Sequence, residues 1–261
     1  MLDLLYRDDH YIAINKPNGV FVHRTALGPG EASCMPVLRN QIGQWVYPVH
    51  RLDRGTSGAL VFALSSEAAR ELARLFEQRQ VKKTYLAVVR GYVPEQDRID
   101  YAFETDDGSG VAQAVTAFTR EAKVELPYPV GRYATARYSL VRVMPLTGRQ
   151  HQIRRHFSHI RHPVVGDTRY GDRAHNRFFR DLFGLKRMLL MATEIGFCHP
   201  FTGAPVIIRA PLPGNIRYLF QRFGWDDGEG MPAVDSRGSS ETPYVSTDAV
   251  EPESKNRRID E

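Results

Sequence analysis

The alternation of hydrophobic and polar residues predicts a series of strands along the chain. Alternating segments at residues 4–6 and 11–14 flank two aspartates and predict a hairpin, and a turn follows at residues 16–19. The nearly unbroken apolar run at 58–64 is typical of a strand buried on both faces of a sheet. Further strands are predicted at residues 83–89, 113–119, 134–144, 188–197 and 206–210.

Three segments have the spacing of apolar residues that is typical of helices. The first begins at the serine pair 65–66 and extends to about residue 80. The second covers residues 147–162, with Thr147 as its N-cap and Pro163 as its terminator. The third covers residues 214–223 and is the last helix that the pattern predicts.

One domain of mixed strands and helices accounts for residues 1–226. No internal repeat or linker interrupts this part, and no Gly-x-Gly-x-x-Gly follows the first strand, which disfavours a dinucleotide-binding α/β fold. We therefore expect an α+β fold.

From residue 227 the sequence is rich in Gly, Ser, Pro and Glu and has little apolar periodicity, so it cannot bury enough surface to offset the entropy of ordering. We expect residues 227–261 to be a disordered tail.

Composition narrows the class of protein. Of the 261 residues, 42% are hydrophobic and 25% are charged, as in ordinary globular proteins. No apolar run is long enough to span a bilayer, and the N-terminus lacks the order of a signal peptide, so we expect a cytoplasmic protein with no membrane partner. Cys34 and Cys198 lie far apart and outside any Cys-x-x-Cys, which argues against a disulfide framework or a thiolate zinc site.

Positive charge is concentrated in one part of the sequence. Residues 132–187 contain 13 basic and 3 acidic side chains, whereas residues 1–131 contain 15 and 16, and the tail contains 4 and 9. Arginine accounts for 29 of the 35 basic residues. Such a stretch indicates a phosphate-rich partner, nucleic acid before anionic membrane, and a solvated basic face without a partner is the alternative.

A single carboxylate stands among several cations in the run HRLDRGTSG at residues 50–58. Arginine can donate two parallel hydrogen bonds to a carboxylate or a phosphate, so Asp53 is either neutralised by a neighbour or kept ionised beside an anionic substrate. An ordinary surface ion pair is the simpler alternative for any such cluster. Thr56 and Ser57 are expected to shape the turn and to hydrogen-bond Asp53.

A later run, LTGRQHQIRRH at residues 146–156, falls in the second predicted helix. At about 100° per residue, Arg154 borders the apolar stripe of this helix and Arg155 points away from it, so Arg154 is the better partner for Asp53. Arg149 would lie in the first helical turn, where its charge opposes the helix dipole. That position favours a phosphate or an acidic neighbour for Arg149.

These runs, together with KKTYLAVVRG at residues 82–91, resemble the motifs of the RluA family of pseudouridine synthases. The resemblance covers about residues 3–210. It implies a mostly antiparallel mixed sheet with a central cleft and flanking helices, and it implies an enzyme that acts on RNA. It also implies roles for individual residues: catalysis by Asp53 with Arg154 and Tyr85, and substrate binding by Arg51, Arg54, Leu190, Arg149 and Arg155.

The implied roles differ in kind. Tyr85 would stack on an extruded uracil and Leu190 would form an apolar wall of its pocket. Arg51 or Arg54 would fill the space that the base vacates, and the resemblance favours Arg51. Arg155 is a candidate contact for backbone phosphate, with solvated surface as the alternative.

Features such as QIGQ at residues 41–44 and GRYATARY at residues 131–138 are most similar to the branch of the family that modifies uridine 65 in the acceptor-stem region of tRNA. We therefore expect a monomeric enzyme that isomerises this uridine to pseudouridine and needs no cofactor. Whether Asp53 acts as nucleophile or as general base stays open.

Three other functions are weighed against this one. A ribosomal-RNA pseudouridine synthase is the alternative within the family. A non-catalytic RNA-binding protein of the same fold would need basic surface but no isolated acid, and a glycoside hydrolase would need a second carboxylate. The histidines at 151, 156, 159 and 162 lack a His-Glu-x-x-His pattern, so we expect no metal site.

Overall fold

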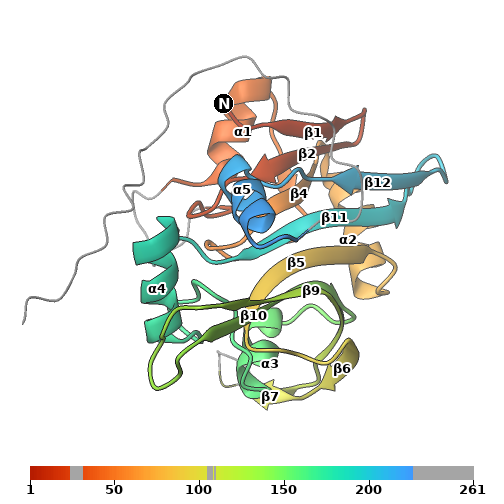
Figure 1. Cartoon of the computed structure of the whole chain (residues 1–261). Helices are drawn as coiled ribbons and strands as arrows, with labels where there is room; N and C mark the ends of the chain where they lie inside the picture. Colours follow the sequence, from red (N-terminus) through yellow and green to blue (C-terminus); the bar gives the residue numbers. More distant parts are fainter. Residues whose placement is uncertain (24–31, 105–107, 109, 226–261) are drawn as a thin grey trace, which may run out of the picture. The chain divides into compact units, whose positions relative to one another are not determined.

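The computed structural model describes residues 1–23, 32–104, 108 and 110–225 (Figure 1). Its strands are β1 (Leu4–Arg7), β2 (Tyr11–Lys16), β3 (Tyr47–Pro48), β4 (Ser57–Ala63), β5 (Lys82–Arg90), β6 (Gln96–Asp100), β7 (Phe103–Glu104), β8 (Val111–Ala112), β9 (Val115–Leu126), β10 (Ala136–Pro145), β11 (Leu190–Cys198) and β12 (Pro205–Arg209). Its helices are α1 (Cys34–Ile42), α2 (Ser66–Glu77), α3 (Gln152–His159), α4 (Arg173–Phe183) and α5 (Gly214–Arg222).

Ten of these strands form one sheet in the order β1-β2-β4-β11-β5-β10-β9-β6, with β12 paired to β11 and β3 to β4. Neighbouring strands run antiparallel except for β4 and β11, which are parallel. The short pair β7 and β8 is separate. Figure 1 shows the sheet running from β1 to β6 with helices on both sides. The α+β fold class expected from the sequence is confirmed.

The predicted strands are confirmed, with some shifts at their ends. The first hairpin corresponds to β1 and β2, and all seven residues of β4 are buried, as a strand covered on both faces must be. Strand β9 continues to Leu126, well beyond the predicted end at residue 119. Its second half alternates exposed charged residues with half-buried ones and pairs with β10 apart from a register shift at Glu121, so its polar composition conceals a strand.

The predicted helices are only partly correct. Helix α2 begins where expected, with Ser65 as N-cap, but ends at Glu77 rather than near residue 80, and α5 matches its prediction. The helix predicted at 147–162 is wrong over its first part, because α3 begins only at Gln152. Helices α1 and α4 were not predicted, and the predicted tail lies outside the described residues. No helix among the described residues has the length and apolarity needed to cross a membrane.

Alternate residues of the central strands enter different hydrophobic clusters. On β4, Leu60 and Phe62 share a cluster with α1, whereas Val61 and Ala63 share one with α2. Because successive side chains of a strand point to opposite faces, α1 and α2 cover opposite faces of the sheet. In the same way α3 packs on the face of β5 opposite to α4 and α5.

Tyr85 of β5 marks the place where the two clusters on the face of α1 and α3 meet. Its side chain packs against both of them. Leu52 belongs to the cluster of α1, and Ile153 and Leu190 belong to that of α3. The loop before β4, the start of α3 and the start of β11 therefore converge at Tyr85.

The parallel pairing of β4 with β11 depends on Gly58. A Cβ added to this residue, whose φ is +115°, would lie 2.0 Å from the carbonyl oxygen of Ala192. We expect Gly58→Ala to lower the free energy of unfolding by about 3 kcal/mol or more, because both the backbone conformation and the contact forbid a side chain. Urea unfolding measures this loss.

The control for this substitution is Gly203→Ala. Gly203 also has a positive φ, of +71°, but a Cβ there meets nothing within 4 Å. Gly203→Ala should lower the free energy of unfolding by only about 1 kcal/mol, the cost of the backbone conformation alone. Equal losses in the two variants would show that the close approach of β4 to β11 does not limit stability.

Candidate active site

Asp53 lies in the loop before β4, and hydrogen bonds from the turn that follows β2 hold this loop. The buried ammonium of Lys16 donates to the Arg54 carbonyl at 3.2 Å, and Asn18 donates to the Gly55 carbonyl. Burial lowers the pKa of Lys16 to about 8. Because the backbone carbonyls point toward these donors, the Asp53 side chain is left partly accessible, at 19% exposure.

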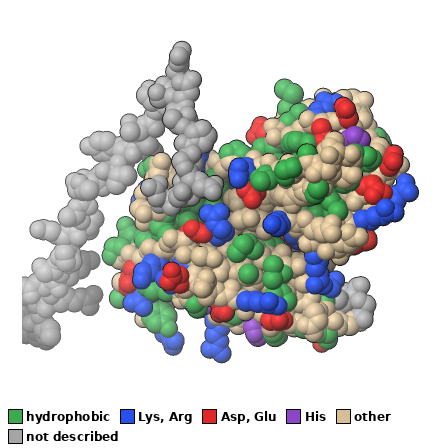
Figure 2. Space-filling view, turned by 90° about the vertical axis from the view of Figure 1, so that its right-hand side faces the viewer, with side chains coloured by type: hydrophobic (Ala, Val, Ile, Leu, Met, Phe, Trp, Pro, Cys, Tyr) green, Lys and Arg blue, Asp and Glu red, His purple; other side chains and the backbone are tan. Residues whose placement is uncertain are grey.

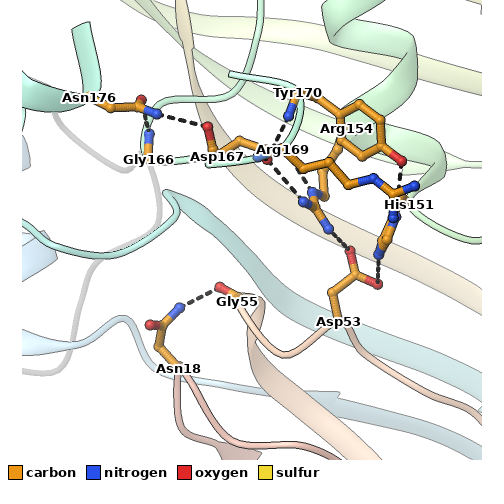
Figure 3. Close-up of polar contacts among 10 residues, drawn as sticks. All are labelled: Asn18, Asp53, Gly55, His151, Arg154, Gly166, Asp167, Arg169, Tyr170 and Asn176. Carbon is orange, nitrogen blue, oxygen red and sulfur yellow. Dashed lines mark hydrogen bonds and ion pairs between the residues drawn. The ribbon is translucent and has the colours of Figure 1, made fainter. Parts of the chain in front are cut away.

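Arg154 of α3 joins Asp53 to a second carboxylate (Figure 3). Its Nη1 donates to Asp53 Oδ2 at 3.0 Å, while Nε and Nη2 donate to the two carboxylate oxygens of Asp167 at 2.7 and 2.9 Å. The Asp167 side chain is fully buried. The bidentate contact with Asp167 fixes the plane of the guanidinium, and the remaining nitrogen is directed at Asp53.

The contacts within this bridge favour the charged forms of Arg154 and Asp167. Burial alone would raise the pKa of Asp167, but hydrogen bonds from Arg154 and from the amides of Arg169 and Tyr170 outweigh it and lower that pKa. Burial likewise opposes the charge of Arg154, and its contacts with Asp167 and Asp53 more than compensate, so its pKa is raised. Arg154 is therefore a permanent cation beside Asp53.

The other oxygen of Asp53 faces His151. The distance from His151 Nε2 to Asp53 Oδ1 is 3.9 Å, and His151 Nδ1 lies 3.1 Å from the Tyr170 hydroxyl (Figure 3). The guanidinium of Arg154 lies over the Tyr170 ring, 5.1 Å from its centroid. Tyr170 thus supports both groups that approach the carboxylate.

The loop before α3 corrects the prediction for Thr147. His151 is the residue before the helix and has a left-handed backbone, with φ of 55°. Thr147 instead donates its hydroxyl to Gln152 Oε1 at 2.6 Å, and the same oxygen accepts the amide of Arg149 at 3.0 Å. Arg149 therefore lies outside the helix, and the argument that placed it in the first turn is wrong.

Two hollows meet at Asp53. The first hollow is lined by apolar side chains, including Tyr85, Leu190 and Ile153, and by Arg149 and Lys83. The second hollow shares Asp53 with the first, and six of its lining residues are lysines or arginines. Its cations are Arg51, Arg54, Arg154, Arg169, Lys186 and Arg187.

Seven of the eight site residues predicted from the sequence line these hollows. Asp53, Arg154 and Arg51 line both, whereas Tyr85, Leu190 and Arg149 line only the first, and Arg54 only the second. Arg155 is the exception. Its guanidinium lies over the Phe103 ring, 3.9 Å from the centroid, and donates to the Glu104 carbonyl at 2.9 Å, outside both hollows.

The basic stretch at residues 132–187 is partly neutralised within the fold. Arg142 pairs with Glu121 at 2.7 Å and Arg137 with Glu125 at 3.2 Å, both acids belonging to the neighbouring strand β9. On the face that Figure 2 shows, basic side chains are interspersed with acidic ones. The sequence asymmetry therefore overstates how much positive charge is available to a partner.

Sequence reasoning missed Asp167 and misplaced Ser57. Asp167, which binds Arg154 through both carboxylate oxygens, was not among the site residues predicted from the sequence. Ser57 was expected to bond Asp53, but its hydroxyl accepts from Arg187 at 2.5 Å. The bond from this turn to Asp53 is made instead by the Thr56 amide, which donates to the Asp53 carbonyl at 3.0 Å.

A second group of ligand-type side chains lies away from the hollows, at Asp8, His10 and His199. His199 Nδ1 accepts the amides of residues 201 and 202, so its Nε2 carries the proton and donates to Asp8 Oδ2 at 3.1 Å. Asp8 also accepts from the Tyr6 hydroxyl. This group is accounted for by hydrogen bonds that join two turns.

The geometry around Asp53 suits reaction at a flat, uncharged ring. The carboxylate has one oxygen bound by Arg154 and lines a hollow that has a tyrosine and a leucine in its wall. An acid in this position can serve as a nucleophile or as a base toward a group in the first hollow.

Comparisons with known proteins agree with this geometry. A family model for RNA pseudouridylate synthase matches residues 10–159. The chain is 49% identical over 234 residues to tRNA pseudouridine synthase C of Haemophilus ducreyi, covering 86% of this chain and 96% of that protein. It is 46% identical over 238 residues to tRNA pseudouridine synthase C of Vibrio cholerae, covering 87% and 98%.

Solved structures show the same fold. Human RNA pseudouridylate synthase domain containing 1 superposes with a TM-score of 0.65 and 29% identity, over 82% of this chain and 84% of that one. Human RNA pseudouridylate synthase domain containing 4 gives a TM-score of 0.66 over 88% and 95% of the two chains, at 23% identity, and so bears on the fold alone.

The Asp167 contact generates a stability prediction. We expect Asp167→Asn to lower the free energy of unfolding at pH 7 by about 3–5 kcal/mol, because it breaks a buried ion pair. The pKa of Asp167 is lowered in the fold, so its contribution is complete above the unfolded pKa, about 3.9, and is lost as the pH falls through the lower folded value. Urea unfolding of both proteins between pH 3 and pH 7 measures this dependence.

The difference between wild type and Asp167→Asn should therefore be constant above about pH 5 and shrink below pH 4. Asp181→Asn, which changes an acid that is 60% exposed, serves as the control and should cost little at any pH. A difference that stays constant to pH 3 would show that Asp167 does not stabilise the fold through its charge.

Proposed function

The chain belongs to the RNA pseudouridylate synthase family, and from this premise we propose that it converts uridine 65 of tRNA to pseudouridine, with Asp53 as the catalytic residue. The curated relatives with 45–49% identity are tRNA enzymes by name. The observation that carries the proposal is the position of Asp53, which is bound by Arg154 and lines the first hollow together with Tyr85 and Leu190. We also propose that it acts as a monomer, since a single chain supplies the whole bridge from Asp167 to Asp53. Its proposed location is the cytoplasm, as expected from the sequence.

The reaction is an isomerisation within one nucleotide. The bond between C1′ of the ribose and N1 of uracil breaks, the detached base turns, and C1′ bonds to C5. The proton that leaves C5 is balanced by the proton that N1 gains, so no oxidant or other co-reactant is consumed. Asp53 acts either by attacking the nucleotide or by removing this proton.

The first hollow accounts for the handling of the base. A uridine within a helix must leave its stack before reaction, at a cost of about a few kcal/mol. Tyr85 and Leu190 offer flat and apolar surface to the extruded ring, and stacking on an aromatic side chain offsets part of that cost. Arg51, which lines both hollows and is exposed, is placed to occupy the space that the base leaves.

Mapping of pseudouridine in RNA tests the substrate. Total RNA from cells that lack the enzyme is incubated with the purified protein, and new pseudouridines are located by sequencing. We expect one new site, at position 65 of tRNA. A new site in ribosomal RNA instead would transfer the assignment to the other branch of the family, and no new site would refute the activity.

Asp53→Asn should abolish pseudouridine formation. Its affinity for tRNA should stay within about tenfold of wild type, because contacts with phosphate dominate binding to RNA. Asp97→Asn, an exposed carboxylate on β6, is the matched control and should retain full activity. Turnover by Asp53→Asn near the wild-type rate would exclude Asp53 as the catalytic residue.

Tyr85→Phe separates stacking from hydroxyl chemistry. The Tyr85 hydroxyl borders the first hollow, and burial together with the charge of Asp53 raises its pKa, so it is a neutral group that can donate a hydrogen bond. We expect tRNA binding to persist and the single-turnover rate to fall by roughly 100-fold. Tyr218→Phe, at an exposed tyrosine on α5, is the control. An unchanged rate would restrict Tyr85 to stacking.

A further inference from the structure

Among the described residues, the second hollow is lined by more cations than carboxylates. Six cations line it, against two carboxylates, Asp53 and Asp167. Both carboxylates are already bound by one of the six, Arg154. Arg187, another of the six, has neither Asp53 nor Asp167 among its hydrogen-bond partners.

Arg187 is the cation that is built most firmly into this hollow. Its Nη2 donates to Ser57 Oγ at 2.5 Å and its Nε to the Met188 carbonyl at 3.4 Å, so its partners among the described residues are neutral. Burial lowers its pKa, without a nearby acid to oppose the effect. A half-buried guanidinium held by neutral oxygens is costly unless an anion completes its surroundings.

The backbone beside Arg187 is fixed, which makes the position of its side chain reproducible. The Leu189 amide donates to the Val165 carbonyl at 2.8 Å. Gly166 packs so closely that an added Cβ would lie 2.0 Å from the Arg187 carbonyl oxygen. The segment that carries Arg187 is thus clamped against the segment that carries Asp167.

Arg54 extends the cationic surface from the opposite wall. Its Nε donates to the Gly19 carbonyl at 3.0 Å, and its guanidinium lies 5.2 Å from the centroid of the Phe21 ring. It belongs to the same loop as Asp53, whereas Arg187 precedes β11. Arg54 and Arg187 thus reach the second hollow from two different segments of the chain, and both line it together with Asp53.

We propose that the second hollow binds a backbone phosphate of the RNA strand next to the reacting uridine, and that Arg187 is its principal contact. This inference rests on the proposed function and names where the strand lies when the base occupies the first hollow. Both hollows share Asp53, so a nucleotide can place its base in one and its phosphodiester in the other. Guanidinium groups match phosphate through planar, paired donors.

Single-turnover kinetics with modified RNA test the contact. The substrate is the tRNA in which the wild-type enzyme forms pseudouridine, prepared with one neutral methylphosphonate at a time at the phosphates on either side of that uridine. With wild-type enzyme we expect one position to raise the half-saturating enzyme concentration about tenfold, since a hydrogen bond to a charged group is lost.

Arg187→Gln should raise the half-saturating concentration for unmodified tRNA by a similar factor, with the maximal rate within about threefold. At the sensitive position the methylphosphonate should then cause no further loss, whereas Arg187→Lys should retain part of the sensitivity. Arg70→Gln, an exposed arginine of α2 outside both hollows, is the control of equal charge and should behave as wild type.

Equal sensitivity of wild type and Arg187→Gln at every phosphate would overturn the proposal and leave Arg187 a purely structural role. Because positions are compared within each variant, a general loss of affinity or stability cannot imitate the expected pattern. Absence of pseudouridine with the wild-type enzyme would refute the proposed function itself, and the contact with it. Pseudouridine formed without any sensitive phosphate would refute only the contact.

Discussion

The bridge from Asp167 through Arg154 to Asp53 is the interaction on which the rest of the site depends. A buried carboxylate is tolerated only when it is paired, and Asp167 obtains its pair from Arg154. The same pairing leaves one guanidinium nitrogen for Asp53, 3.0 Å away. The buried Asp167 thus determines, through Arg154, how the more accessible Asp53 is held.

This bridge also ties together parts of the fold that the sheet alone does not connect. Asp53 precedes β4, Arg154 lies on α3, and Asp167 belongs to the segment between α3 and α4. That segment is clamped in turn to the backbone at Arg187 through Gly166. One packing arrangement therefore positions both the Arg187 segment of the second hollow and the guanidinium that holds the Asp53 carboxylate.

The periodicity of apolar residues predicted the main strands and the face of α3 that carries Arg154. Where the predictions failed, the cause lies in particular side-chain contacts. The apolar stripe of α3 selected Arg154 over Arg155 correctly, because a helix face depends only on spacing. The start of that helix was wrong because the side chain of Gln152 binds Thr147 and the Arg149 amide, a contact that no pattern of apolar residues reveals. Asp167 was missed because its importance comes entirely from a partner on another element.

The pairing of β4 with β11 determines when, during synthesis of the chain, the parts of the site can come together. Asp53 leaves the ribosome early, but Arg154 follows 101 residues later, and the bond from Arg187 to Ser57 closes a loop of 130 residues. Until β11 is synthesised, only the two-residue strand β3 pairs with that edge of β4, and long-range pairings of this kind form slowly. A chain that ends before Arg154 therefore contains Asp53 without the guanidinium that holds it, and one that ends before Arg187 lacks the bond to Ser57.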